Sequence, residues 1–265
     1  MRLKRLADLK KSARREIPLA SLPQEIFITP FAREKAFAIN ALVRTIHGQS
    51  YEWYGFTLAW RQQPEIIVDI GLPVNDQNQD QYVRLAADQI AAFREALPEA
   101  MLINGWIHSH GALDLQQFST LDAANQATVL DFVTARLWLP VTKVEVAVHN
   151  LVCLQEDCWQ EADLRQGSVT LITDAPVRRV QIWETEYGGF CYAIVIGDDG
   201  WHEQEIHYKK RGILSGRTFI SRQTAAMTLV ADGRRLTDSD REALAQEVRT
   251  RLSPVPYTPP KLEGL

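Results

Sequence analysis

The sequence is organised around residues 104–122, which read Asn104-Gly-Trp-Ile-His-Ser-His-Gly-Ala-Leu-Asp-Leu-Gln-Gln-Phe-Ser-Thr-Leu-Asp122. An apolar run that begins at Met101 predicts a buried strand, and this strand ends on His108 and His110. Side chains on a strand alternate between two faces, so both imidazoles are expected on one face and Ser109 on the other. The two histidine Cα atoms would then lie roughly 6.6 Å apart, close enough for both rings to reach one ion.

An eight-residue loop follows the histidines, and Ser119 and Asp122 then open an Ala-rich segment that predicts a helix. Two imidazole nitrogens, from His108 and His110, and one carboxylate oxygen, from Asp122, make a three-ligand set that suits Zn²⁺ and leaves a fourth position for water. An open position is typical of a catalytic site, because a structural zinc site is closed by four protein ligands. Asp114, in the loop, is the alternative carboxylate ligand.

This arrangement resembles the signature of the JAMM (MPN-plus) metallopeptidases, in which His-x-His is followed by a spacer and then Ser-x-x-Asp. Members of that family also need a Glu on an early strand with a Gly three residues later, and Glu52 and Gly55 supply both in a segment of strand composition. Two positions depart from the family pattern: the spacer before Ser119 is one residue longer than usual, and Gly111 stands where Pro is common. The resemblance covers residues 26–150 by motif and continues to about residue 210 by pattern alone.

The resemblance implies an α/β fold of the MPN (cytidine-deaminase-like) type, a mixed β-sheet flanked by helices, and a zinc-dependent peptidase or isopeptidase. It implies that Zn²⁺ is held by His108, His110 and Asp122. Glu52 would be the general base that later returns its proton to the leaving amine, and the Ser119 hydroxyl would stabilise the oxyanion.

The resemblance also implies a substrate, the amide bond after the C-terminal tail of a ubiquitin-like protein, in precursor processing or deconjugation. Activating or conjugating enzymes are further implied partners, since the chain looks more like stand-alone bacterial members, some of which belong to antiphage systems. Two other functions stay open: a metal-free MPN scaffold that binds partners, and a JAMM-like hydrolase of a small-molecule amide.

The candidate residues also have structural interpretations. Ser119 and Asp122 form a pattern that is common at helix N-termini, although a metal-bound Asp122 would be expected to do little capping. Glu52 could be a surface charge on an edge strand, and Trp106 is more often a core residue than a substrate platform. His202 and His207 lie in a polar hairpin segment and are expected to be exposed.

Composition narrows the class of protein. With 46% hydrophobic and 23% charged residues among 265, the chain belongs to the ordinary globular class. A net charge of −4 gives no reason to expect nucleic acid as a partner. Three Cys do not indicate a disulfide framework, so Cys153 and Cys158 are expected to be free thiols in a cytoplasmic protein. No apolar run reaches the length of about eighteen residues that a membrane span needs, and we expect no membrane partner.

Local signals predict the remaining elements. Thr29-Pro30 predicts the start of a helix that Gly48 ends, and Asp199-Gly200 and Asp232-Gly233 predict turns. A Ser239–Glu242 capping box is expected to open the last helix. The full prediction is helices over 31–47, 82–97, 120–137 and 239–252, strands over 51–60, 65–72, 101–107, 143–149, 168–173, 178–186, 190–197 and 201–209, and a loop over 75–81.

These patterns divide the chain into four parts. Residues 1–25 form a basic N-terminal arm, and residues 26–210 form the metallopeptidase domain, whose boundary lies between 150 and 210. Beyond residue 150 the chain becomes β-rich. Residues 211–252 are a C-terminal appendage, and residues 253–265 are a Pro-rich tail.

Overall fold

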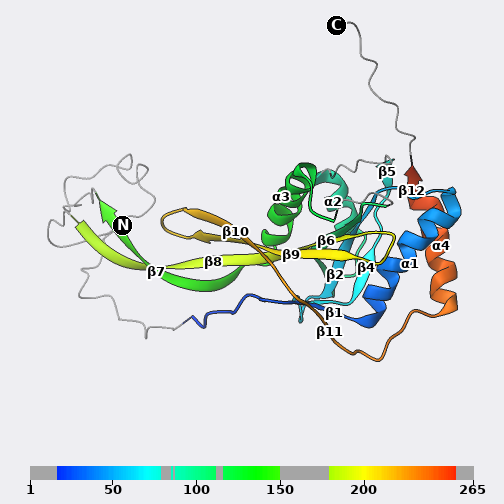
Figure 1. Ribbon diagram of the computed structural model, residues 1–265. Helices are drawn as coiled ribbons and strands as arrows, with labels where there is room; N and C mark the ends of the chain where they lie inside the picture. Colours follow the sequence, from blue (N-terminus) through cyan, green and yellow to red (C-terminus); the bar gives the residue numbers. More distant parts are fainter. Residues whose placement is uncertain (1–16, 79–84, 86, 112–115, 150–178, 255–265) are drawn as a thin grey trace, which may run out of the picture. The chain divides into compact units, whose positions relative to one another are not determined.

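The computed structural model describes residues 17–78, 85, 87–111, 116–149 and 179–254 (Figure 1). Several expectations therefore lie outside the described residues, namely those on the arm over 1–16, Asp114, Cys153, Cys158, the strand over 168–173 and the tail from 255 onward. The chain divides into two compact units, and each is described by itself. The predicted division into arm, metallopeptidase domain, appendage and tail stays a prediction.

The larger unit, residues 22–137, 189–209 and 220–254 of the described chain, is built on a mixed β-sheet. The sheet has the strand order β10-β9-β8-β6-β2-β4, in which β6 runs parallel to β8 and antiparallel to β2, and β2 runs antiparallel to β4. Of its last three strands, residues 189–196 of β8, 202–209 of β9 and 220–224 of β10 belong to this unit. The mixed sheet and its flanking helices confirm the α/β class. The strand bounds are β2 Trp53–Trp60, β4 Asp69–Gly71, β6 Met101–Ser109, β8 Arg179–Ile196, β9 His202–Gly212 and β10 Thr218–Thr224.

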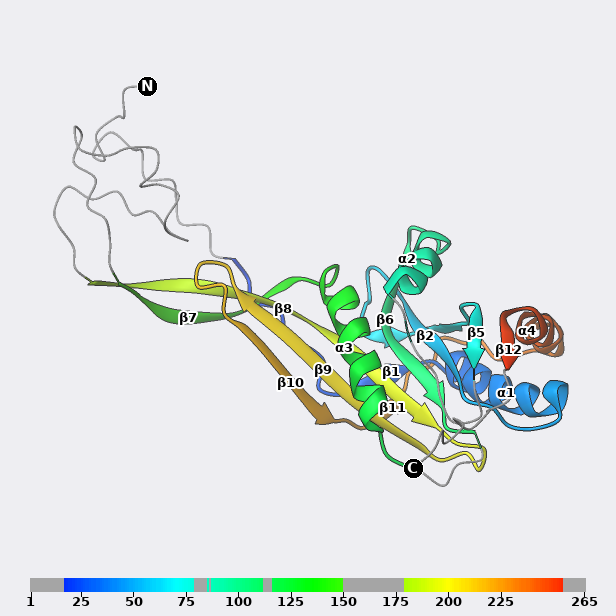
Figure 2. The ribbon, with the colours of Figure 1, turned by 90° about the horizontal axis from the view of Figure 1, so that it is seen from above.

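Four helices pack on this unit, α1 Pro30–His47, α2 Ala87–Glu95, α3 Thr120–Thr134 and α4 Asp238–Arg251. α3 packs against β6 and α2, whereas α1 packs against β4 and α4. Figure 2 shows α1 and α4 side by side. None of the helices in the described part of the chain is long and apolar enough to cross a membrane.

The predicted signals at α1 are confirmed. The Thr29 hydroxyl accepts the Ala32 N–H at 3.2 Å, Pro30 occupies the first helical position, and Gly48 ends the helix with φ +80°. A left-handed residue is needed there to turn the chain out of the helix, and only Gly adopts it without a steric penalty.

Several predictions of local structure are wrong. Part of the expected loop 75–81 is a strand, β5 Asn75–Asn78, which pairs in parallel with β12 Leu252–Pro254. The capping box of α4 is formed by Thr237 and Asp240 rather than by Ser239 and Glu242, and the helix therefore begins one residue earlier, at Asp238.

The strands expected over 178–186 and 190–197 are one continuous strand, β8. Residues 187–189 between them were expected to lie outside any strand. Instead, Gly189 lets the strand pass the backbone of Leu137, because an added Cβ would lie 1.9 Å from the Leu137 carbonyl oxygen. A separate parallel sheet joins β11 Met227–Leu229, β1 Ile26–Ile28 and β3 Ile66–Ile67.

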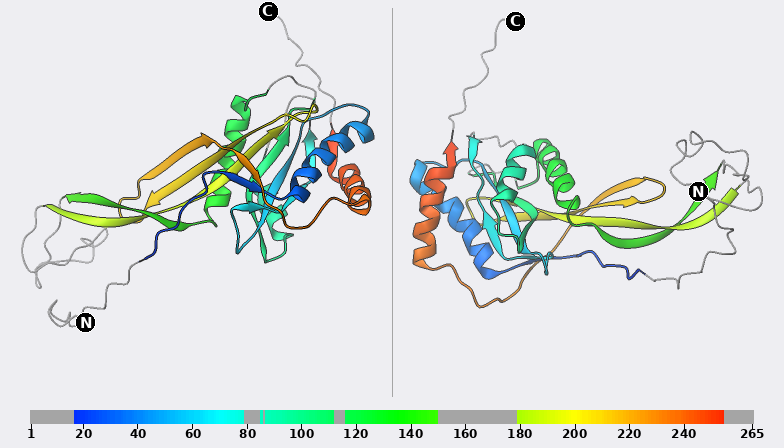
Figure 3. Two further views of the ribbon diagram at one scale, coloured as in Figure 1. Left: turned by 60° about the horizontal axis from the view of Figure 1, so that its bottom comes forward. Right: turned by 180° about the vertical axis from the view of Figure 1, so that it is seen from behind.

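The smaller unit consists, in the described chain, of residues 17–21, 138–149, 179–188 and 210–219. Its main element is the antiparallel pair of β7 Leu139–His149 with the first half of β8, visible in Figure 3. The buried Glu184 carboxylate holds the turn after β9, since it accepts the N–H groups of Leu214 and Ser215 at 2.9 Å each and the Ser215 hydroxyl at 2.6 Å.

Candidate metal centre

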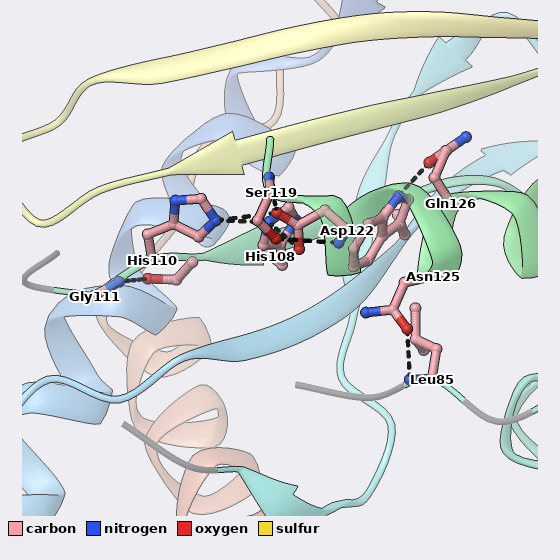
Figure 4. A network of polar contacts seen from close by, with 10 residues as sticks. Leu85, His108, His110, Gly111, Ser119, Asp122, Asn125 and Gln126 are labelled. Atoms are coloured by element: carbon pink, nitrogen blue, oxygen red, sulfur yellow. Dashed lines mark hydrogen bonds and ion pairs between the residues drawn. The ribbon is translucent and has the colours of Figure 1, made fainter. Parts of the chain in front are cut away.

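The end of β6 carries the two histidines to one place in the larger unit. His108 pairs with Tyr54 on β2, and the His110 backbone N–H donates to the Ile196 carbonyl at the end of β8, at 3.0 Å. Both imidazoles face the first turn of α3, as Figure 4 shows, and the predicted shared face is therefore confirmed.

Asp122 of α3 completes a compact group of three possible ligands. The two histidine Nε2 atoms lie 3.2 Å apart, Asp122 Oδ1 lies 3.2 Å from His108 Nε2, and Asp122 Oδ2 lies 3.4 Å from His110 Nε2 (Figure 4). Tetrahedral Zn²⁺ with ligand distances near 2.0–2.2 Å would separate its ligand atoms by about 3.3–3.5 Å. All three residues are buried, and the donor set fits a metal ion.

The charges of this group also suit a cation. Burial alone would raise the pKa of Asp122, but hydrogen bonds from His108, His110 and Ser119 together hold it well below its ordinary value. Burial lowers the pKa of His108, against the opposing effect of Asp122. The pair is therefore best described as an ionised carboxylate beside a neutral imidazole, which are the protonation states that metal binding requires.

Ser119 and Asp122 orient one another at the start of α3. The Ser119 N–H donates to Asp122 Oδ2 at 2.6 Å, and the Asp122 N–H donates to the Ser119 hydroxyl oxygen at 3.2 Å. The carboxylate that faces both histidines therefore also caps the helix. An ionised group in the first turn is also stabilised by the helix dipole.

Trp106 supports the site from within the core. Its indole stacks on the His108 ring, with centroids 4.4 Å apart and an interplanar angle of 11°, and its N–H donates to the Gln126 side chain on α3. Trp106 is fully buried, which confirms that it is a core residue. It therefore connects the strand that carries the histidines with the helix that carries Asp122.

Glu52 lies beside this group. Trp53 pairs with Ser109, so Glu52 lies one residue beyond that pair, opposite His110. The side chain of Glu52 is buried, and it is not the exposed edge-strand charge of the structural interpretation. Burial raises the pKa of Glu52 to about 7. The charge of His110 partly opposes this rise, and the charge of Asp122 adds to it. A carboxyl group with this pKa exchanges protons near neutral pH.

Gly111 accounts for one departure from the family pattern. Its φ of +56° is a left-handed conformation, whereas Pro is restricted to φ near −65°. Its N–H also donates to the Ser109 hydroxyl oxygen at 2.8 Å, and Pro has no such donor. The backbone conformation directly after His110 therefore excludes Pro at position 111.

Three site residues were missed from the sequence. Phe118 and Trp201 lie near His108 and His110, with ring centroids 5.9 Å and 6.1 Å away respectively, and Asn40 bonds to the segment between the histidines. The Asp199-Gly200 turn signal placed Trp201 at the start of a strand, but nothing in the sequence indicated which turn would face the histidines.

The expectation of exposure is wrong for His207. This residue is buried and bonds to Glu205 through an Nε2–Oε2 contact of 2.8 Å, while His202 is half-buried. Neither residue belongs to the metal-ligand group.

No protein-family model matches the sequence, and no curated protein matches it. The assignment of function therefore depends on the site itself.

Proposed function

We propose that this protein is a metal-dependent amide hydrolase of the JAMM type, a peptidase or isopeptidase that cleaves after the C-terminal tail of a ubiquitin-like protein. The observation that carries the hydrolase proposal is the placement of three metal-ligand side chains at tetrahedral spacing, with the buried carboxyl group of Glu52 beside them. The substrate class is supported by the motif resemblance alone.

We assign the ion to Zn²⁺, held by His108, His110 and Asp122. Two imidazoles and one carboxylate match the donors of catalytic zinc sites, which keep one position open. When bound, such an ion supplies a Lewis acid that polarises a carbonyl and lowers the pKa of water to about 7.

Glu52 carries the proton in this proposal. Its carboxylate form accepts a proton from the attacking water, and its acid form returns that proton to the departing amine nitrogen, which is too basic to leave unprotonated. Burial raises the pKa of Glu52 to about 7 in the metal-free protein, and a cation bound beside it would favour the carboxylate form that accepts the proton.

Ser119 is the proposed donor to the oxyanion. Its hydroxyl oxygen accepts the Asp122 N–H, and its O–H bonds to the Asp122 carboxylate in the metal-free protein. In this proposal the O–H turns from that carboxylate to donate to the developing negative charge. The helix N-terminus on which it lies adds a favourable partial positive charge.

The test begins with zinc content. The purified full-length protein is expected to hold about one equivalent of Zn²⁺, and the His108→Ala and Asp122→Ala variants to hold none. A wild-type protein that takes up no zinc, even when zinc is supplied, would exclude the hydrolase and favour the metal-free scaffold.

The second measurement concerns the substrate. The zinc-loaded protein is incubated with a ubiquitin-like protein that carries a C-terminal extension, and mass spectrometry is used to detect trimming. Glu52→Gln is the matched control, since it removes the proton carrier and keeps all three ligands; we expect trimming to fall by about 100- to 10,000-fold. Trimming at the wild-type rate by this variant would refute the role of Glu52. Zinc uptake without trimming, joined to turnover of small amides, would favour the small-molecule hydrolase.

A further inference from the structure

We infer that Asn40, on α1, is a positioning residue for the candidate metal centre: its buried amide fixes the ends of β6, β2 and β8 around the ligands. The inference depends on the metal-binding function proposed above and assigns to that site a residue outside its ligand set.

The first contact of Asn40 is with the segment between the histidines. The Ser109 hydroxyl donates to Asn40 Oδ1 at 2.6 Å, from the face of β6 opposite to the imidazoles. Ser109 also accepts the Gly111 N–H at 2.8 Å, so its hydroxyl group is bonded on both sides. Because His108 and His110 flank Ser109, any rotation of the strand end at Ser109 would move both ligands.

The second contact is with the strand that follows Glu52. The Trp53 indole N–H donates to the same Asn40 Oδ1 atom at 3.0 Å. This oxygen therefore receives hydrogen bonds from the neighbour of Glu52 and from the neighbour of both histidines. The backbone segments that carry the proposed base and the proposed ligands are held to one acceptor atom.

The third contact is with the turn after β8. Asn40 Nδ2 donates to Asp198 Oδ1 at 2.8 Å, and the other Asp198 oxygen accepts the Ser50 hydroxyl. The Asp198 backbone N–H donates to the Gly111 carbonyl at 3.2 Å, which ties this turn to the chain just after His110.

These contacts leave Asn40 a single orientation. Its oxygen faces two donors and its nitrogen faces a carboxylate, so the amide is not interchangeable by a flip. The residue is only 6% exposed, and water cannot readily replace the bonds if the side chain is removed. Groups that orient metal ligands through hydrogen bonds typically change metal affinity by about 10- to 100-fold when they are lost.

The experiment compares Asn40→Ala with Asn104→Ala. Asn104 is also buried, lies on the same strand as His108, accepts the Thr57 hydroxyl at 2.7 Å and donates to the Pro64 carbonyl at 2.9 Å, but it bonds to none of the site segments. Both variants are expected to lower the melting temperature. Competition with a chromophoric chelator is expected to show a Zn²⁺ dissociation constant raised about tenfold by Asn40→Ala and changed less than about twofold by Asn104→Ala.

A double-mutant cycle with Ser109→Ala tests the route of the effect. If Asn40 acts through Ser109, the two substitutions together weaken zinc binding by less than the product of their separate effects. The Co²⁺ absorption spectrum gives a second readout, because distortion of the ligand geometry shifts the visible bands and a purely structural loss of stability does not. If Asn40→Ala does not fold, Asn40→Asp replaces it: this variant keeps acceptors for Ser109 and Trp53, but it replaces the donation to Asp198 with repulsion between two carboxylates and should also weaken zinc binding.

Equal zinc affinity in Asn40→Ala and wild type, or equal weakening by Asn40→Ala and Asn104→Ala, would overturn the positioning role while leaving the metal centre in place. A wild-type protein that binds no zinc would overturn both. The same zinc titration therefore distinguishes failure of the positioning role from failure of the proposed metal centre.

Discussion

The indole of Trp106 and the imidazole of His108 lie nearly parallel, with ring centroids 4.4 Å apart. The two side chains point to the same face of β6 because they are two residues apart. Trp106 also donates to Gln126, one turn after Asp122 on α3, and it therefore stabilises the position of a proposed ligand on each element.

We expect Trp106→Phe to lower the free energy of unfolding of the metal-free protein by about 1–3 kcal/mol, because it leaves the buried Gln126 oxygen without its donor. Urea denaturation followed by circular dichroism measures this change. Trp60→Phe is the control, since Trp60 is 47% exposed and its substitution should change stability by no more than about 0.5 kcal/mol. Equal effects of the two substitutions would contradict the structural role of the indole.

The raised pKa of Glu52 predicts how the stability of the metal-free protein depends on pH. Between the ordinary value of 4.5 and about 7, the folded protein holds a proton on Glu52 that the unfolded chain has lost. Stability therefore falls as pH rises through this window, by about 3 kcal/mol at most, and Glu52 adds no slope below it. Glu52→Gln should remove this part of the slope in urea titrations carried out with chelator present, whereas Glu99→Gln, at an exposed position, should leave it. An unchanged slope in Glu52→Gln would show that Glu52 is not the group that titrates.

Ser119 has two roles in the proposal, as helix cap and as donor, and one substitution separates them. Gly is tolerated at an N-cap with a loss of only a few tenths of a kcal/mol, but it has no hydroxyl group. We expect Ser119→Gly to keep zinc and nearly all stability while kcat falls by about 100- to 1000-fold. If this variant keeps the wild-type kcat, Ser119 caps the helix but does not donate to the oxyanion.

Gly111 provides a test of backbone conformation. At φ +56°, Gly111→Ala should lower the free energy of unfolding by about 1–2 kcal/mol. Gly111→Pro should cost more, because it cannot adopt this φ and also removes the N–H that Ser109 accepts. Thermal unfolding of the two variants measures which substitution lowers the stability more. If Gly111→Pro is more stable than Gly111→Ala, residue 111 does not adopt the left-handed conformation.

Much of the site could be predicted from local pattern. The two-residue repeat of a strand placed His108 and His110 on one face, and the pattern of a helix N-terminus placed Asp122 in the first turn of α3. Turn and cap signals such as Gly48 and Asp199-Gly200 depend only on neighbouring residues, and the structure confirms them.

The remaining features depend on contacts between distant segments, which no local pattern encodes. Asn40 is 69 residues from Ser109, and an Asn on a helix gives no indication of the strand that it will contact. No local signal showed that Gly189 lets β8 pass close to the Leu137 carbonyl, 52 residues earlier in the chain. The choice of Thr237 over Ser239 as the α4 cap was equally hidden, since both positions have an acidic residue three places later.

The reciprocal bonds between Ser119 and Asp122 predict how the protein would respond if the proposed zinc ion were withdrawn. The Ser119 N–H and hydroxyl group orient the Asp122 carboxylate, so its orientation does not depend on a bound cation. Small zinc modules collapse on chelation because the ion is their principal cross-link. Here the chelated chain should keep its tertiary structure and rebind zinc in a single association step, without a folding phase.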